Sequence, residues 1–239
     1  MADLDALISI AEDYQLPLIE DAAESLGARW KDKSIGAPHE QEKEIRRFVC
    51  SSFNGNKIMT TGGGGVLLTN DEATAQLTRH LSTTAKTDDI EFDHDQVGYN
   101  YRMNNIAAAL GIGQLEQLDF FLERKKEIAE QYTQAFSTQK GIAATLPTGA
   151  NVTNSYWLYT ILLEKNSRNL LNHLTENGIQ TRPLWKPLCD LPYLDQCHIH
   201  AADNTRHLTN NSLSIPSSVG LSNTDQQKVI HSIQTYLKN

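Results

Sequence analysis

Leu16-Pro17-Leu18-Ile19-Glu20-Asp21 is a short apolar run that ends in two acidic residues. An amphipathic segment precedes it, with apolar side chains at helical spacing: Leu4, Leu7, Ile8, Ile10 and Ala11. This order predicts a helix followed by a buried strand of a parallel sheet, with Asp21 at the carboxyl end of the strand. Ligands of open α/β sheets bind at that end, so Asp21 is a candidate binding residue.

A second informative stretch is Ser52-Phe53-Asn54-Gly55-Asn56-Lys57, which continues through Ile58-Met59-Thr60-Thr61 into four glycines, Gly62 to Gly65. It sets one lysine among small polar residues, with a serine hydroxyl shortly before it. A lysine that forms a Schiff base needs such a turn, because its amine must approach a carbonyl and the backbone must pass close to an anionic cofactor. An exposed lysine in a Gly-rich hairpin turn would explain the same stretch, and both interpretations stay open.

Asp21 also has two interpretations. Asp21-Ala22-Ala23-Glu24 has the outline of a capping box, in which the carboxylate would cap a following helix. Together with Lys57, the carboxylate can instead bind the pyridinium nitrogen of pyridoxal phosphate while the lysine carries the aldehyde of that cofactor. The pair therefore fits a pyridoxal-phosphate site, and both interpretations of Asp21 stay open.

Six segments, in this order, resemble the DegT/DnrJ family of nucleotide-sugar aminotransferases, which are pyridoxal-phosphate enzymes of the aspartate aminotransferase-like fold type I. They are residues 19–27, 52–57 with 60–65, 98–103, 114–116, 181–187 and 215–221. The similarity covers nearly the whole chain. Its last two segments resemble the branch that acts on UDP- or GDP-linked 4-keto-6-deoxy sugars.

The resemblance implies a role for each matching residue around the cofactor. Lys57 matches the lysine that binds the aldehyde of pyridoxal 5′-phosphate and then shuttles a proton, and Asp21 matches the partner of the pyridine nitrogen. Glu24 lies where many relatives carry a glutamine beside the phenolic oxygen of the cofactor. Ser52 matches a phosphate-binding hydroxyl.

The resemblance also implies a homodimer with shared active sites. Asn100, with Arg102 nearby, matches a loop that in the family reaches across the dimer to the phosphate bound by the partner subunit. The implied reaction transfers an amino group, with glutamate as donor, to a nucleotide-linked keto-deoxy sugar for surface-polysaccharide or glycan biosynthesis.

The implied fold class is α/β: part of a fold-type-I large domain over residues 1–140, then a small α+β domain over residues 141–239. Two departures from the family are visible. The segment that supplies the phosphate cup and the ring stacked on the cofactor in the family has no counterpart before Met1. The polar tract 37–50 replaces a shorter, glycine-containing turn and strand. A truncated, inactive remnant or interaction partner is therefore the alternative reading, and we expect the isolated chain to bind the cofactor weakly.

Composition favours a soluble cytoplasmic protein. Of 239 residues, 39% are hydrophobic, no apolar run approaches the roughly 20 residues that span a bilayer, and no signal peptide opens the chain. A net charge of −8, from 21 basic and 29 acidic residues, argues against nucleic acid as a partner. Cys189, Cys197, His198 and His200 cluster in sequence, but without a second ligand pair they predict an ordinary polar loop and no metal site.

The remaining pattern alternates helices and strands. We predict a strand over 65–69, a helix over 71–83 capped by Asn70 or Asp71, a functional loop over 84–99 in which His94 is an exposed residue, and one long helix over 104–136. After an interruption at 141–154, we expect strands over 156–163 and 179–184 and helices over 167–177, 201–211 and 223–237.

Three residues at or just beyond the end of the 179–184 strand are candidates for substrate contact. Arg182 and Lys186 could bind a diphosphate, and Trp185 could stack on a nucleobase. A tryptophan between two prolines can also serve only as a packing plug, and this alternative stays open.

Overall fold

The structure of the protein is a computed structural model that describes residues 2–38, 45–88, 90–145 and 149–238. The chain forms two compact units, Met1–Phe120 with Ala150–Ser155 and Phe121–Gly149 with Tyr156–Asn239. These units are defined by contacts within the chain. The domain boundary that the sequence suggests near residue 140 stays a prediction.

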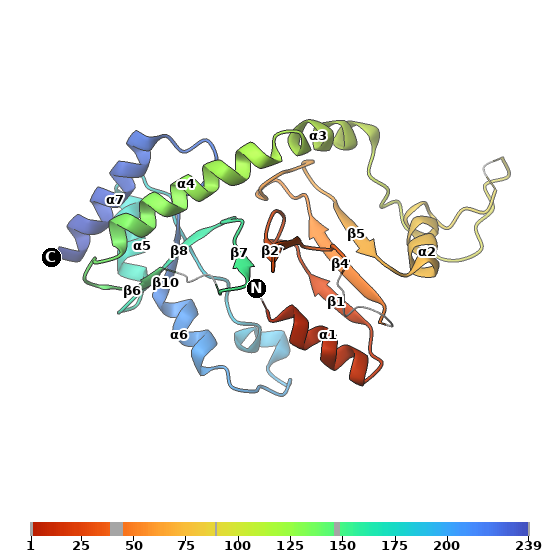
Figure 1. Cartoon of the computed structure of the whole chain (residues 1–239), viewed down its shortest axis with the longest axis horizontal. Helices are drawn as coiled ribbons and strands as arrows, with labels where there is room; N and C mark the ends of the chain where they lie inside the picture. Colours follow the sequence, from red (N-terminus) through yellow and green to blue (C-terminus); the bar gives the residue numbers. More distant parts are fainter. Residues whose placement is uncertain (1, 39–44, 89, 146–148, 239) are drawn as a thin grey trace. The chain divides into compact units, whose positions relative to one another are not determined.

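The first unit contains a three-stranded sheet, ordered β1-β4-β5, with β4 in the centre (Figure 1). Strand β1 (Leu18–Asp21) runs parallel to β4 (Arg47–Ser52), and β5 (Gly65–Thr69) runs antiparallel to β4. The predicted strand that ends at Asp21 and the predicted strand over 65–69 are both present. Asp21 and Ser52 therefore both lie at carboxyl ends of parallel strands.

Helix α1 (Leu4–Asp13) precedes β1, as the amphipathic pattern predicts, and the Asp3 side chain accepts a hydrogen bond from Ala6 N at 3.1 Å. Strands β3 (Lys33–Ser34), β2 (Arg29–Trp30) and β7 (Val152–Thr153) form a three-stranded ribbon. The Trp30 side chain of this ribbon packs with α1 in a small hydrophobic core. The core residues are Leu4, Ile8, Ala11, Trp30 and Ile45. Leu7 and Ile10, which the pattern also marks as apolar, are exposed.

Helix α2 (Glu72–Ser82) follows β5, and Asp71 is its N-cap because Asp71 Oδ2 accepts from Thr74 N at 2.9 Å. The segment 84–99 then folds back on itself through a bridge between Lys86 and His94. His94 is exposed, as predicted, and its Nδ1 lies 2.8 Å from Thr84 O.

The prediction of one long helix over 104–136 is wrong. Helix α3 (Asn105–Leu115) ends before a turn at Glu116 and Gln117, and α4 (Leu118–Phe136) begins after it. The turn contains neither proline nor glycine, so the local sequence carries no stop signal that would have revealed it.

The tract 37–50 lies partly outside the described residues. Its described end enters the sheet through Arg47, which is 3% exposed and pairs with the Glu20 carboxylate. Arg47 Nη1 also donates to Ala37 O at 2.9 Å. A charged residue is thus accommodated in a central strand because a carboxylate and a backbone carbonyl pair with its guanidinium.

The second unit contains an antiparallel sheet ordered β6-β8-β10-β9. Its strands are Ile142–Thr145, Tyr159–Leu163, Ser212–Ile215 and Arg182–Pro183, in that order. The predicted strand over 179–184 is shortened to β9, and β6 and β10 were not predicted. All four residues of β10 are buried.

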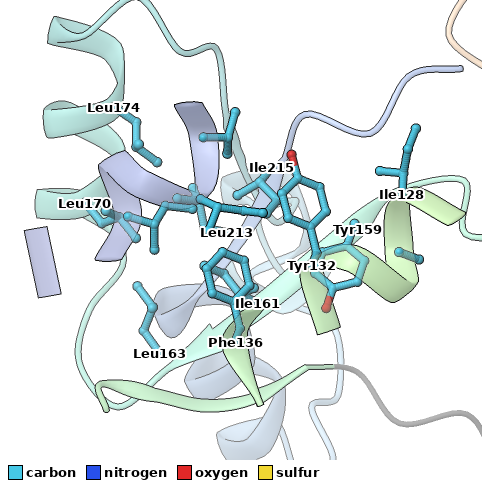
Figure 2. Close-up of a cluster of buried hydrophobic side chains, with 14 residues drawn as sticks. Ile128, Tyr132, Phe136, Tyr159, Ile161, Leu163, Leu170, Leu174, Leu213 and Ile215 are labelled. Carbon is cyan, nitrogen blue, oxygen red and sulfur yellow. The ribbon is translucent and has the colours of Figure 1, made fainter. Parts of the chain in front are cut away.

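Helices α4, α5 (Arg168–Glu176) and α7 (Asn223–Lys238) supply the other side chains of this core, shown in Figure 2. Tyr132 stacks on Phe136 at a centroid distance of 5.9 Å, and its hydroxyl donates to Pro216 O at 2.8 Å. The fully buried members include Ile128, Tyr132, Ile161, Leu174, Leu213 and Ile233.

The predicted helix over 201–211 is α6 (Asp203–Asn211), and the loop before it contains two short 3-10 turns, η1 (Leu188–Asp190) and η2 (Pro192–Leu194). Across the described ranges, the longest and most apolar helices still fall short of what a membrane crossing requires.

Candidate active site

Asp21 lies at the end of β1, beside Cys50 of the parallel strand β4. Ala22 N donates to Cys50 O at 2.8 Å, so the chain leaves the sheet at this point. Residues 22–28 form turns and no helix, and Asp21 Oδ1 accepts from Ala23 N at 3.2 Å. The helix-cap interpretation of Asp21 is therefore wrong, whereas its position at a strand end is the one that a ligand-binding carboxylate requires.

Lys57 lies in the connection between β4 and β5, which is folded around Phe53. Thr61 N and Thr60 Oγ1 both donate to Phe53 O at 3.0 Å, and Phe53 N donates to Gly64 O at 2.9 Å. The glycine run allows this path, since Gly62 and Gly64 have φ angles of 81° and 96°. We call residues 53–64 the lysine turn.

The Lys57 side chain is only 12% exposed, although it belongs to a hairpin connection. Buried Ile58 and Met59 follow it in the turn. The Lys57 amine lies 3.8 Å from Glu24 Oε1, which the turns after β1 bring to it. The interpretation as an exposed lysine is thus wrong, and two of the predicted site residues are neighbours.

Ser52 ends β4, directly before the lysine turn. Its hydroxyl is half-buried and accepts a hydrogen bond from Asn54 N at 3.3 Å. The hydroxyl, the Asp21 carboxylate and the Lys57 amine all belong to segments that leave the carboxyl ends of β1 and β4.

Asn100 and Arg102 lie on a different segment of the first unit. Asn100 forms a bridge with Thr83, and Arg102 N donates to Ser82 O at 3.0 Å, so both are tied to the end of α2. Both side chains are exposed. The rings of Tyr99 and Tyr101, on either side of Asn100, stack on each other with their centroids 5.1 Å apart.

The three candidate substrate contacts belong to the second unit. Trp185 is 61% exposed and stacks on buried Trp157, with ring centroids 6.0 Å apart and planes inclined by 23°. Arg182 and Lys186 are exposed as well. Because the inner ring is Trp157, Trp185 presents its outer face as an aromatic surface.

Comparison with known proteins adds the decisive observation. The model of the DegT/DnrJ/EryC1/StrS aminotransferase family matches residues 1–234. The chain belongs to this family.

Two curated relatives show how much of the family fold the chain contains. EpsN of Bacillus subtilis (strain 168), assigned to the pyridoxal phosphate-dependent aminotransferases, is 36% identical over 235 residues, which are 96% of this chain and 58% of EpsN. GDP-perosamine synthase of Escherichia coli O157:H7 is 33% identical over 237 residues, 98% of this chain and 62% of that enzyme. The chain thus spans about 60% of the length of these relatives.

Solved structures agree on the fold. The aminotransferase TlmJ from Streptoalloteichus hindustanus superposes with a TM-score of 0.88 at 27% identity, over 99% of this chain and 63% of TlmJ. DesV of S. venezuelae, solved in complex with a ketimine intermediate, gives a TM-score of 0.87 at 25% identity, over 100% of this chain and 62% of DesV. The α/β prediction of a partial fold-type-I transferase is confirmed.

Pyridoxal 5′-phosphate is the cofactor that family membership supports, and the residues at the strand ends fit it. An amine at the end of a side chain that is only 12% exposed, beside a carboxylate, suits an aldehyde. The Asp21 carboxylate, which is exposed at a strand end, suits a pyridinium nitrogen, and the Ser52 hydroxyl suits a phosphate oxygen.

Sequence reasoning did not identify a pocket in the second unit. Its volume is about 420 Å³, and its lining includes Cys189, Cys197, His198 and His200. Beside it, the Arg206 guanidinium donates to Asp190 Oδ1 and lowers the pKa of that carboxyl. Among the described residues, no group of three or more His, Cys, Asp or Glu side chains is arranged to hold a metal ion.

Proposed function

We propose that this chain carries the cofactor-binding part of an aminotransferase that acts on a nucleotide-linked keto-deoxy sugar. The observation that carries the proposal is the Lys57 amine, which is held in a glycine-rich turn 3.8 Å from Glu24 and close in sequence to the end of a parallel strand. Membership of an aminotransferase family supports the reaction class. A UDP- or GDP-linked 4-keto-6-deoxyhexose as acceptor, with glutamate as donor, is the substrate pair that we favour.

The cofactor, when bound, withdraws electrons from the carbon that exchanges its amino group. The residues of this chain would hold and orient it: Lys57 covalently, Asp21 at the ring nitrogen and Ser52 at the phosphate. The Lys57 amine is also the base that can move a proton at the reacting carbon, because it lies on a turn that reaches the site. Glu24 would lie beside the phenolic oxygen and keep the lysine oriented.

In the second unit, Trp185 would contact the nucleotide. Its exposed ring, supported by Trp157, is a surface on which a base can stack. Arg182 and Lys186 supply positive charge for a diphosphate. These roles rest on side-chain chemistry and on GDP-perosamine synthase, whose name states a nucleotide-linked sugar.

We further propose that the active form is a homodimer. Asn100 and Arg102 are exposed on a stretch that backbone hydrogen bonds hold in place, so they can complete the phosphate site of a partner subunit. A closed two-fold arrangement would give each site the same contribution.

A non-catalytic protein that binds another polypeptide is the second candidate. Its support comes from α3, on which Ile106 is 85% and Ile112 is 62% exposed. Side chains of this kind on a helix are usually covered.

One assay separates the two candidates. The protein purified from its natural source is incubated with glutamate and each of the two nucleotide-linked keto sugars, and the aminated product is measured by mass. The proposal expects a product from one of them and none from a Lys57→Arg variant, since a guanidinium cannot bind the aldehyde. No product from either sugar would favour the non-catalytic candidate.

A further inference from the structure

Helix α3 contacts the lysine turn at two points, one polar and one steric. At the polar point, Gln114 Oε1 accepts a hydrogen bond from Thr60 N at 3.3 Å, across 54 positions of sequence. Thr60 lies three residues after Lys57 in the same turn. The glutamine therefore fixes the end of the turn whose other side carries the amine.

At the steric point, α3 passes so close to the turn that only glycine fits. A Cβ added to Gly111 would lie 2.8 Å from Thr61 Cγ2, and Thr61 is 7% exposed. Gly113 on the same helix meets no atom within 4 Å in the same test. The absence of a side chain at position 111 is thus explained by the approach of Thr61 in the lysine turn, and not by the packing of α3 in general.

The rest of α3 does not account for this close approach. Ile106, Leu110 and Leu115 of the helix are 85%, 48% and 57% exposed, so the contact with the turn is local. Within the turn, Thr60 Oγ1 and Thr61 N both bind Phe53 O. A shift of Thr60 or Thr61 would consequently move the whole loop that holds Lys57.

We infer that α3 is the positioning element of the lysine turn, with Gln114 and Gly111 as positioning residues for the covalent binding of pyridoxal phosphate by Lys57. The inference rests on the proposed function. It gives a role to the 114–116 segment, to which the proposed chemistry assigns none. Displacing a reactive group by about 1 Å can slow a reaction by roughly 100-fold, so small changes in α3 should be measurable at Lys57.

The polar contact is tested in the 239-residue chain with pyridoxal phosphate as the probe. Borohydride fixes the bound probe, and peptide mapping gives the rate of labelling at Lys57 relative to exposed Lys228 in the same molecule. Gln114→Met keeps the length of the side chain but removes the acceptor, and we expect at least about tenfold slower labelling at Lys57. Gln114→Glu keeps an acceptor and should label at nearly the parental rate. Gln117→Met, which removes only a bond to Gly113 O, is the matched control.

The steric contact is tested by Gly111→Ala, with Gly113→Ala as its control. Gly113→Ala should keep or gain thermal stability and leave labelling at Lys57 unchanged, because alanine favours helix over glycine and the new Cβ meets no atom. Gly111→Ala must displace Thr61, so it should slow labelling at Lys57 without a gain in stability. Thr61→Ser removes the Cγ2 atom that the new methyl would meet. The double variant Gly111→Ala/Thr61→Ser should therefore recover the labelling rate, whereas a loss of labelling that does not arise from this contact would persist in it.

A second readout needs no cofactor: the hydrogen-exchange rate of the Thr60 amide should rise in Gln114→Met while that of the Thr61 amide stays low. Equal labelling at Lys57 and unchanged Thr60 exchange in Gln114→Met would overturn the inference. A parental chain in which Lys57 is labelled no faster than Lys228 would instead contradict the proposed function, and the exchange measurement would still decide the role of α3.

Discussion

The two units of the molecule differ in the size of the hydrophobic core that each of them closes. The second unit closes a core in which Ile161, Leu174 and Leu213 have no exposed surface. The first unit buries a small cluster around Ile8 and leaves Ile19 71% and Val97 80% exposed. Yet the first unit carries the lysine turn. Side-chain packing therefore dominates the stability of the second unit, whereas the chemistry that we propose for the first unit depends on the geometry of a few polar groups.

The largest effect that this contrast predicts concerns Asp21. Asp21→Asn can still accept the hydrogen bond from Ala23 N, so the strand end should stay folded. A neutral amide does not hold a proton on the pyridine nitrogen, and amino transfer should slow by several orders of magnitude. The measurement compares the turnover of the Asp21→Asn variant with that of the parental protein. Asp71→Asn, which replaces one good N-cap by another, is the control. Parental turnover in a folded Asp21→Asn variant would remove Asp21 from the site.

An intermediate effect is expected from matched leucines of the two units. Leu213 is 0% exposed in β10, and Leu115 is 57% exposed at the end of α3. Leu213→Ala should lower the free energy of unfolding by about 2–5 kcal/mol, because it leaves a cavity in a closed core. Leu115→Ala should change it by no more than about 0.5 kcal/mol. Urea unfolding measures both, and similar values for the two variants would erase the contrast.

The smallest effect concerns Lys125, which is 5% exposed and donates to Ser217 O at 2.6 Å. Burial lowers the pKa of Lys125 from 10.5 to about 8. At pH values between about 8 and 10.5, Lys125 is still protonated in the unfolded chain but has lost its proton in the folded unit. The free energy of unfolding should therefore rise with pH in this range. The gain from pH 8 to pH 10 is roughly 2–3 kcal/mol.

The pH series has a clear control. Lys125→Met should flatten the rise, whereas Lys228→Met, which removes an exposed lysine paired with Asp225, should not. The window must end near pH 10, because burial raises the pKa of Tyr132 and reverses the sign at higher pH. A rise of equal size in Lys125→Met would assign the effect to other groups.

The sequence predicts best where the signal is local. Helix α1, strand β1 and the Asp71 cap follow from periodicity and capping chemistry within a few residues. Strand β10 escaped prediction because its Ser212 and Ser214 look like loop residues. They are buried in the sheet, where Ser214 Oγ lies 2.9 Å from Thr160 Oγ1.

The residues of the candidate site also differ in whether a local sequence signal points to them. Lys57 and Asp21 stand in segments whose residue types point to a chemistry, so both could be proposed as site residues from the sequence. The contact of Gln114 with Thr60 could not, because the partner is 54 positions away and neither residue carries a charge. The burial of Arg47 in a central strand could not be predicted either, since its partner Glu20 comes from the neighbouring strand.

The central claim is that Lys57 holds the cofactor, and borohydride reduction in the presence of pyridoxal phosphate tests it most directly. Proteolysis and mass spectrometry of the reduced protein then locate the added mass. We predict that the adduct lies on Lys57 and that Lys57→Arg removes it, while the second unit keeps its unfolding transition. An adduct that lies on Lys125 or on any other lysine, and that persists in Lys57→Arg, would contradict the account.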